Sequence, residues 1–191
     1  MHRRTLLTAA SCAAACSALA PLGSAHAQVT DLNDAINKAG RQRMLSQRVG
    51  KAWLALAHKA DTPTARQVME QSIALFERQL VELKAYAPSP TIRETYTKLE
   101  TAWAAHKTTL AAATSSTDNA SAMLQADAKV LALAHQGTVQ YEATLGKPVG
   151  KLVNVAGRQR MLSQRMAKFY LAAMLPVDAS TAPTEIAKAR S

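Results

Sequence analysis

One twelve-residue segment occurs twice in this chain, and its two copies limit which folds are possible. The first copy spans residues 37–48 and reads NKAGRQRMLSQR, and the second spans residues 154–165 and reads NVAGRQRMLSQR. Eleven of the twelve positions are identical, at a constant offset of 117 residues. Packing alone would preserve the apolar pattern and let the polar residues drift. Because arginines, glutamines, an asparagine and a serine are copied too, we expect the segment to carry chemistry that involves arginine.

The first 27 residues predict an export signal. Arg3 and Arg4 precede an apolar run from residue 5 to residue 22, and Ala25-His26-Ala27 forms a small-x-small cleavage site. The order Arg-Arg-Thr-Leu-Leu is typical of a twin-arginine signal, and a plain secretory signal is the alternative. The apolar run is too short and too rich in alanine for a membrane span. We therefore expect a soluble protein that is periplasmic or secreted.

Both cysteines, Cys12 and Cys16, lie inside this signal. The rest of the chain has none, which excludes disulfides, thiolate metal sites and cysteine nucleophiles there. A lipoprotein would need a larger aliphatic residue three positions before the modified cysteine, where Ala9 and Ala13 stand. The sequence therefore favours a protein without a lipid anchor, and it suggests no cofactor or metal.

The positive charge of the chain is concentrated in the repeat. The residues after the signal carry an excess of eight positive charges. The basic residues that the two copies share, with the lysine three residues after each copy, equal that excess in number: Arg41, Arg43, Arg48, Lys51, Arg158, Arg160, Arg165 and Lys168. Local basicity of this kind indicates a site or patch for an anion.

Breaker residues and apolar spacing predict an all-α, up-down antiparallel helical bundle, in which a fifth helix repeats the first. The chain is rich in alanine and poor in glycine and aromatic residues. Apolar residues spaced 4-3-4-3 lie between breaks near Asp61, Pro88, Ser116 and Lys147. The expected helices span residues 31–58, 63–86, 91–113, 118–145 and 149–175. We expect residues 28–176 to form one sensor-type bundle and residues 177–191 to be a flexible tail.

Each copy of the repeat places one arginine in a predicted packing seam. The first seam runs through Leu32, Ile36, Ala39, Arg43, Ser46, Gly50, Trp53 and Ala57, and the second through Val149, Val153, Ala156, Arg160, Ser163, Ala167, Tyr170 and Met174. A buried arginine needs a negative partner. Arg43 and Arg160 are therefore the expected centre of a small-anion site, and a salt bridge to a glutamate such as Glu77 or Glu100 is the structural alternative.

The other repeated residues have lesser expected roles. Gly40, Ser46 and their copies Gly157 and Ser163 are small, and they would leave room for a ligand beside the arginines. We expect the remaining repeated polar residues to contribute less to anion binding than Arg43 and Arg160. Their arginines, with Lys51 and Lys168, are expected at the surface. These secondary residues are Asn37, Arg41, Arg48, Asn154, Arg158 and Arg165.

The string AGRQRMLSQR resembles the N-terminal domain of type IV pili methyl-accepting chemotaxis transducers, the PilJ-type domain. The pattern Asn37-x-Ala-Gly-x-x-Arg43-Met-x-Ser46-x-Arg48 is similar to the ligand-sensing segment of nitrate/nitrite sensor histidine kinases. Both families are helical sensor modules. The resemblance to the second implies nitrate binding through the arginine that matches Arg43, at a two-fold dimer interface. This chain differs from the nitrate sensors at Arg41 and Gln42, so the ligand can be another anion.

The order of the helices adds an inference of its own. With four reversals of direction between them, the first and fifth helices run parallel. If they are neighbours, Arg43 and Arg160 face each other inside one chain and reproduce the paired arginines of a sensor dimer. If Pro148 only kinks one long helix, the two copies run antiparallel instead.

The predicted function is a ligand-binding, sensor-type module for a small anion, such as a nitrate-like oxyanion or an anionic metabolite. Any signal would pass through a membrane receptor or another signalling protein, and a homodimer is an option. The alternative is an interaction protein whose basic motif docks on an acidic partner or a membrane surface. Export and scarce aromatic residues disfavour nucleic-acid binding. We expect no enzyme, since neither a nucleophile–base pair nor a phosphate-binding loop is present.

Overall fold

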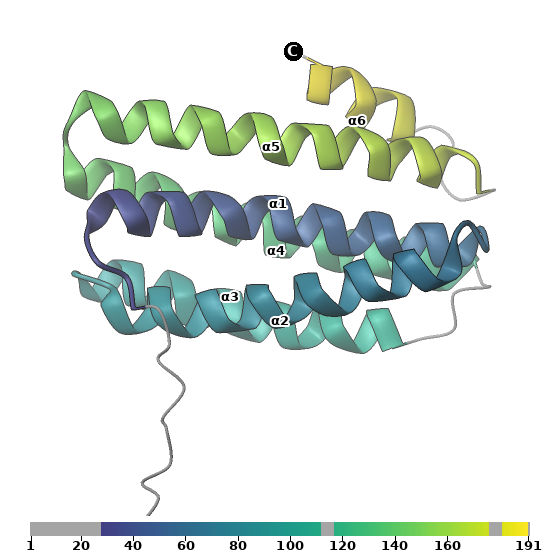
Figure 1. The fold of residues 1–191 in the computed structure, drawn as a ribbon, viewed down its shortest axis with the longest axis horizontal. Coiled ribbons are helices and arrows are strands. Elements are labelled where there is room, and N and C mark those ends of the chain that lie inside the picture. Colours follow the sequence, from purple (N-terminus) through teal and green to yellow (C-terminus); the bar gives the residue numbers. More distant parts are fainter. Residues whose placement is uncertain (1–27, 112–116, 176–180, 191) are drawn as a thin grey trace, which may run out of the picture.

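The computed structural model describes residues 28–111, 117–175 and 181–190, which form six helices and no strand (Figure 1). The helices are α1 (Leu32–Ala57), α2 (Thr62–Tyr86), α3 (Pro90–Ala111), α4 (Thr117–Leu145), α5 (Pro148–Ala173) and α6 (Thr181–Arg190). The all-α prediction is confirmed, and the first five helices lie close to their expected bounds. None of the described helices is long and apolar enough to cross a bilayer. The predicted export signal lies outside the described residues.

A capping aspartate, prolines and a glycine mark several of the helix ends. Asp31 caps α1 by accepting a hydrogen bond from the backbone N–H of Asp34 at 2.8 Å. Proline stands at the start of α2 and again at the start of α5. Gly146, between α4 and α5, has a φ of 61°, a conformation that glycine adopts without strain. The chain therefore reverses at Gly146, and α4 and α5 are separate helices.

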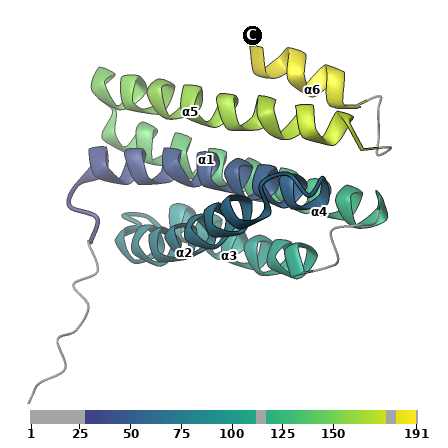
Figure 2. The ribbon, with the colours of Figure 1, turned by 45° about the vertical axis from the view of Figure 1, so that its right-hand side comes forward.

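α1 is the central helix of the fold. The helices α1 to α4 form an antiparallel four-helix bundle, and α5 packs along α1 on the side away from α2 and α3 (Figures 1 and 2). Both α1 and α5 run from left to right in Figure 1, so they are parallel. Of the 26 residues in α1, 15 are buried, against 6 of the 26 in α5. The two copies of the motif therefore occupy unequal environments.

The apolar core lies between α1 and the α2–α3–α4 face. Phe76 stacks on Trp103 with ring centroids 3.9 Å apart, and the indole N–H of Trp53 donates to the carbonyl of Leu110 at 3.2 Å. The hydroxyl of buried Tyr141 donates to the carbonyl of Leu83 at 2.6 Å. Each of these bonds joins two helices, so the aromatic residues fix the relative positions of the bundle helices.

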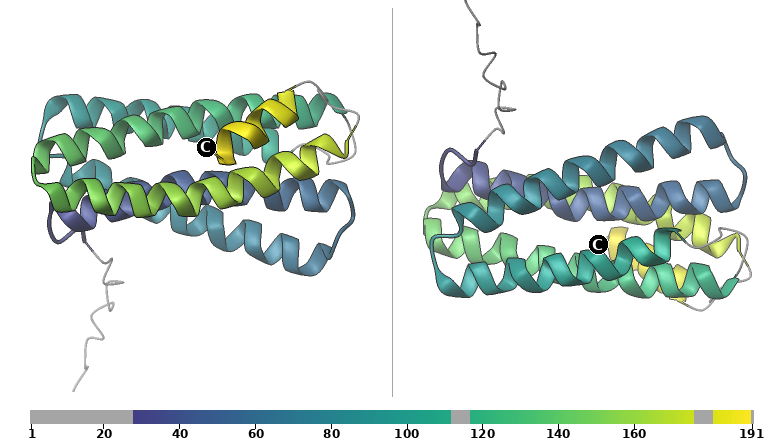
Figure 3. Two further views of the ribbon diagram at one scale, coloured as in Figure 1. Left: turned by 90° about the horizontal axis from the view of Figure 1, so that it is seen from above. Right: turned by 90° about the horizontal axis from the view of Figure 1, so that it is seen from below.

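The region predicted to be a flexible tail contains a helix. α6 packs on α5 and lies between α5 and α4 when the molecule is seen from above (Figure 3, left). Ala182 and Ala189 are buried, and Glu185 pairs with Arg165 of α5 and with Lys188, the latter at 3.1 Å. The short apolar spacing of this helix gave little sequence signal, and its order depends on contacts with α5.

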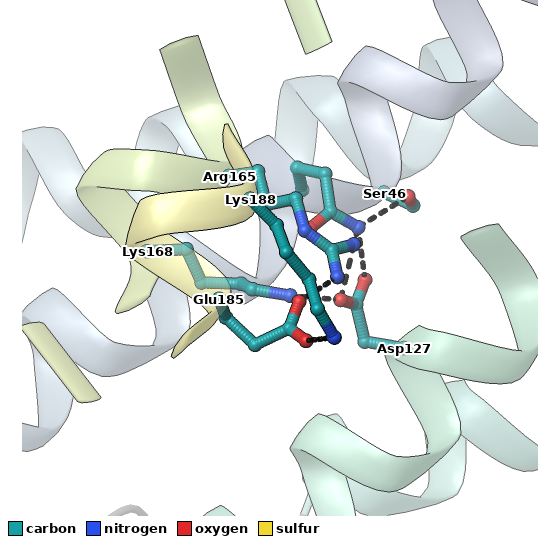
Figure 4. A network of polar contacts seen from close by, with 7 residues as sticks. Ser46, Asp127, Arg165, Lys168, Glu185 and Lys188 are labelled. Carbon is teal, nitrogen blue, oxygen red and sulfur yellow. Dashed lines mark hydrogen bonds and ion pairs between the residues drawn. The ribbon is translucent and has the colours of Figure 1, made fainter. Parts of the chain in front are cut away.

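A buried polar network joins α1, α4 and α5 (Figure 4). The carboxylate of Asp127 accepts hydrogen bonds from the ammonium of Lys168 and from the amide of Gln47, the latter at 2.9 and 3.1 Å. All three side chains are buried. Lys168 was expected at the surface, and this expectation is corrected, because Asp127 supplies a negative partner inside the bundle. Burial lowers the pKa of Lys168, and Asp127 opposes that shift.

We predict that Lys168→Met lowers the free energy of unfolding by about 3–5 kcal/mol, because it leaves a buried carboxylate without its cation. The matched control is Lys98→Met, which breaks an exposed pair with Glu94 and should change stability little. Urea unfolding of both variants measures the difference. Equal effects of the two substitutions would contradict the structural role of the buried pair.

We also predict a pH dependence of stability from His106. Burial lowers the pKa of His106 below the ordinary 6.5, and nearby Asp127 opposes the shift only in part. The unfolded chain therefore binds a proton at pH values where the native chain does not. This contribution to stability is fully present above about pH 6.5 and is lost as the pH falls toward the native pKa.

The slope from one such group is at most about 1.4 kcal/mol per pH unit. Urea unfolding between about pH 5 and 8 should show a shallower dependence for His106→Gln than for the wild-type protein. Parallel curves for the two proteins would show that His106 does not titrate in this way.

Candidate functional site

The two copies of the motif meet where α1 and α5 cross. A Cβ atom added to Gly157 would lie 3.4 Å from the Cα of Gly40 and 3.3 Å from Nη2 of Arg43. A Cβ added to Gly40 would lie 3.4 Å from the same Nη2 atom. The paired glycines therefore let the helices approach closely and leave room for one guanidinium beside the contact.

Arg43 and its copy Arg160 each donate to the asparagine of the other copy of the motif. Nη2 of Arg43 donates to Oδ1 of Asn154 at 2.7 Å and to the carbonyl of the same residue at 3.1 Å. Nη2 of Arg160 donates to Oδ1 of Asn37 at 3.1 Å. These bonds are exchanged across the glycine contact by equivalent residues. The α1–α5 pair therefore has an internal pseudo-two-fold axis, parallel to the two helices.

Arg43 is fully buried, and no carboxylate contacts it among the described residues. Its Nη1 atom lies 3.2 Å from Nδ1 of His135, which accepts the bond when the ring is neutral and carries its single proton on Nε2. Its Nε atom is buried without a hydrogen-bond partner. The expected alternative partners are engaged elsewhere, because Glu77 pairs with Lys107 and Glu100 pairs with Lys84, both at 2.6 Å.

The electrostatic environment of Arg43 is unfavourable to its charge. Burial, together with the charge of Arg158, lowers the pKa of Arg43 to about 10, although Glu142 opposes the shift. Glu142 does not contact Arg43 directly, since its carboxylate accepts a hydrogen bond from the amide of Asn154, which in turn accepts from Arg43. Burial, with the charges of Arg43 and Arg158, also lowers the pKa of His135. Arg43 and Arg158 therefore place two positive charges close together, and the carboxylate of Glu142 does not contact Arg43.

A cleft of about 480 Å³ opens over Arg43. Residues of α4 and α5 make up most of its lining, Arg43 comes from α1, and Lys188 comes from α6. Its lining combines basic and apolar side chains: Arg43, Ala128, Leu131, Ala132, His135, Arg158, Met161, Leu162, Arg165 and Lys188. Among the described residues, no acidic side chain belongs to that lining.

The four cations of the cleft differ in how they are neutralised. Arg165 and Lys188 both pair with Glu185 (Figure 4). Neither Arg43 nor the exposed Arg158 forms an ion pair with any described residue. The uncompensated positive charge therefore lies at the Arg43–Arg158 end of the cleft.

The structure brings together only part of the predicted site. Arg160 was expected in a buried seam facing Arg43, but it is exposed and does not line the cleft. The seam predicted on α5 is largely exposed as well, because the described helices that pack closely against α5 are α1, α4 and α6, and they cover its other sides. Arg158, expected to be secondary, takes the place beside Arg43 instead.

The remaining predicted residues have mainly structural contacts. The hydroxyls of Ser46 and Ser163 each donate to the carbonyl three residues earlier, that of Arg43 at 3.0 Å and that of Arg160 at 2.9 Å. Arg41 and Arg48 are half-buried, and neither lines the cleft. Gly40 and Gly157 do make the room expected of them.

Sequence reasoning missed His135 and Glu142 as parts of this cluster. The position of His135 in the apolar pattern of α4 is as consistent with a histidine that is hydrogen-bonded in the core as with one in a ligand site. Glu142 acts through Asn154, and no spacing in the sequence links two residues that are brought together by a helix crossing.

Comparisons with known proteins identify the type of domain. A family model described as the N-terminal domain of type IV pili methyl-accepting chemotaxis transducers, PilJ, matches residues 25–129 and 143–191. No curated protein and no solved structure matches the chain.

We predict that Gly157→Val destabilises the fold by about 1–3 kcal/mol, because its side chain would press on the backbone of Gly40 and on Arg43. Ala156→Val is the matched control, since Ala156 is exposed on the same helix and loses only about 0.5 kcal/mol of helix propensity. Urea unfolding compares the two. If Gly157→Val is the milder change, the close approach of the helices is not as described.

Proposed function

Because the chain belongs to the family of type IV pili methyl-accepting chemotaxis transducer N-terminal domains, we propose that it is an exported sensor-type module that binds a small anion in the cleft above Arg43. Domains of this family are the N-terminal parts of chemotaxis transducers, which act in signalling. The proposal places the protein in the periplasm, where this N-terminal domain lies in the transducers.

The observation that carries this proposal is the uncompensated charge of Arg43. A buried guanidinium without a contacting carboxylate is costly, and a bound anion would remove that cost. The planar guanidinium suits the two oxygens of a carboxylate or an oxyanion. Arg158 stands at the same end of the cleft and adds a second positive charge.

The composition of the cleft supports an organic anion over bare nitrate. Five apolar side chains line it, namely Ala128, Leu131, Ala132, Met161 and Leu162. Its volume of about 480 Å³ is in the range of pockets for small organic molecules. A metabolite with one carboxylate and a short apolar part would place its charge at Arg43 and its carbon atoms on this lining.

The crossing of α1 and α5 supports a sensor over a simple binding protein. The ligand would contact α4 and α5, and through Arg43 it would also contact α1. An anion that draws Arg43 away from Asn154 or His135 would alter contacts that hold three helices. A change of this kind can pass to a signalling partner.

We predict that Arg158→Gln weakens anion binding roughly tenfold, the lower end of what a charge-assisted contact contributes, since Arg158 is exposed. Arg160→Gln is the matched control, because this arginine is also exposed on α5 but does not line the cleft. It should change the affinity less than about twofold, as expected for a screened, distant charge.

Calorimetry and thermal unfolding with nitrate, sulfate, acetate, butyrate and hexanoate measure this. A ligand at a hundred times its dissociation constant should stabilise the protein by about 2.7 kcal/mol. The proposal is wrong if none of these anions raises the melting temperature, or if Arg158→Gln and Arg160→Gln weaken binding equally.

A further inference from the structure

The outer side of α5 carries an apolar stripe that the described helices leave exposed. Of the eight large apolar side chains that are exposed among the described residues, five lie on α5 and a sixth, Met174, is the C-cap residue of this helix. At about 100° per residue they fall on one side of the helix, with Gln159 among them. We call this set the outer face of α5: Val149, Leu152, Val155, Gln159, Met166, Tyr170 and Met174.

The equivalent side of α1 is covered. Tyr170 is 63% exposed, whereas Trp53, at the same position of the first copy, is fully buried. Met166 is 40% exposed, and its equivalent Val49 is fully buried. The same pattern that is packed in α1 is therefore exposed in α5.

The covered copy shows what kind of surface this pattern accepts. α2 packs against α1. The amide of Gln42 donates to the backbone carbonyl of Phe76 in α2 at 3.3 Å, and Lys38 pairs with Glu82 of α2 at 2.9 Å. Gln159 is the repeat of Gln42, and it is exposed on α5. Within this chain, the helix that covers this pattern in α1 is therefore an antiparallel amphipathic helix, α2.

The charges beside the outer face point to an acidic partner. α5 contains five basic residues and no acidic one. Lys151 and Arg158 flank the outer face on one side and Arg160 on the other, and all three are exposed. Two α5 helices would therefore repel each other, whereas a helix with acidic flanks would be attracted.

Two features favour a helix over a lipid surface. Gln159 stands in the middle of the outer face, where burial in hydrocarbon would leave its amide without a partner. An open groove of about 570 Å³ also runs beside Met166 and Tyr170, and Ile186 and Arg190 of α6 line its other side. Such a groove accepts individual side chains from a facing helix.

We propose that the outer face of α5 is the docking site for an amphipathic helix of a partner protein, with an apolar stripe like that of α2 and acidic residues beside it. The partner helix runs antiparallel to α5. Its apolar side chains cover Leu152, Tyr170 and their neighbours, and Gln159 bonds to its backbone. The inference does not depend on the anion site, since Leu152 and Tyr170 do not line the cleft.

The experiment uses the purified full chain and two labelled peptides, followed by fluorescence anisotropy. One peptide has the sequence of residues 62–86, which is α2. The other carries Arg66→Glu and Arg78→Glu, two positions that are exposed on α2. We expect saturable binding of both peptides and tighter binding of the acidic one, with a difference that shrinks at high salt.

Leu152→Gln should weaken binding of the acidic peptide by about tenfold or more, because Leu152 is 69% exposed in the free protein and would be buried in the complex. Val81→Gln is the matched control. Val81 is 64% exposed on α2, and this change should leave the affinity unchanged.

Four outcomes would overturn the proposal. The first is that neither peptide binds, and the second is that Leu152→Gln and Val81→Gln have equal effects. The third is Leu152-dependent binding to phosphatidylglycerol vesicles without peptide binding, which would assign the outer face to a lipid surface. The fourth is a Leu152-dependent dimer in sedimentation velocity, which would assign it to a second copy of this chain.

Discussion

The contact between Gly40 and Gly157 determines where the other residues of the motif lie. Because neither glycine has a Cβ atom, the backbones of α1 and α5 come close enough for Arg43 and Arg160 each to reach the asparagine of the other copy. The same missing atoms make room for the guanidinium of Arg43. The position of the cleft follows from this crossing, because Arg43 extends from α1 to the walls formed by α4 and α5.

Identical sequences occupy different environments in this fold, and the difference separates their proposed roles. α1 is surrounded by α2, α4 and α5, so most residues of its copy of the motif are buried. α5 lies on the outside of the bundle, so its copy presents polar and apolar residues to solvent. In our proposals the inner copy supplies Arg43 to a ligand, and the outer copy supplies Arg158 to the same ligand and a face to a partner. A ligand and a partner helix would then both contact α5.

Much of the fold could be predicted from the chain, and less of the site. Helix bounds were predictable because proline, glycine and capping residues act within a few neighbours along the sequence, as at Asp31 and Gly146. Arg43 was correctly expected to be buried. Lys168 was not, because its burial depends on Asp127, 41 residues away on another helix. Arg160 was expected in a seam because its heptad pattern matches that of Arg43, but a pattern cannot show whether a covering helix exists.

The sequence alone left the direction of the second motif helix open at Pro148. It determined the class of fold, the approximate bounds of the helices and the two candidate seam arginines, Arg43 and Arg160. These properties depend on local spacing and on the number of turns. Only the tertiary structure decided which copy is buried, that Arg158 and not Arg160 stands beside Arg43, and that His135 and Glu142 belong to the cluster. The physical reason is that burial and electrostatic environment come from neighbours across helix contacts, and two identical segments can have different neighbours.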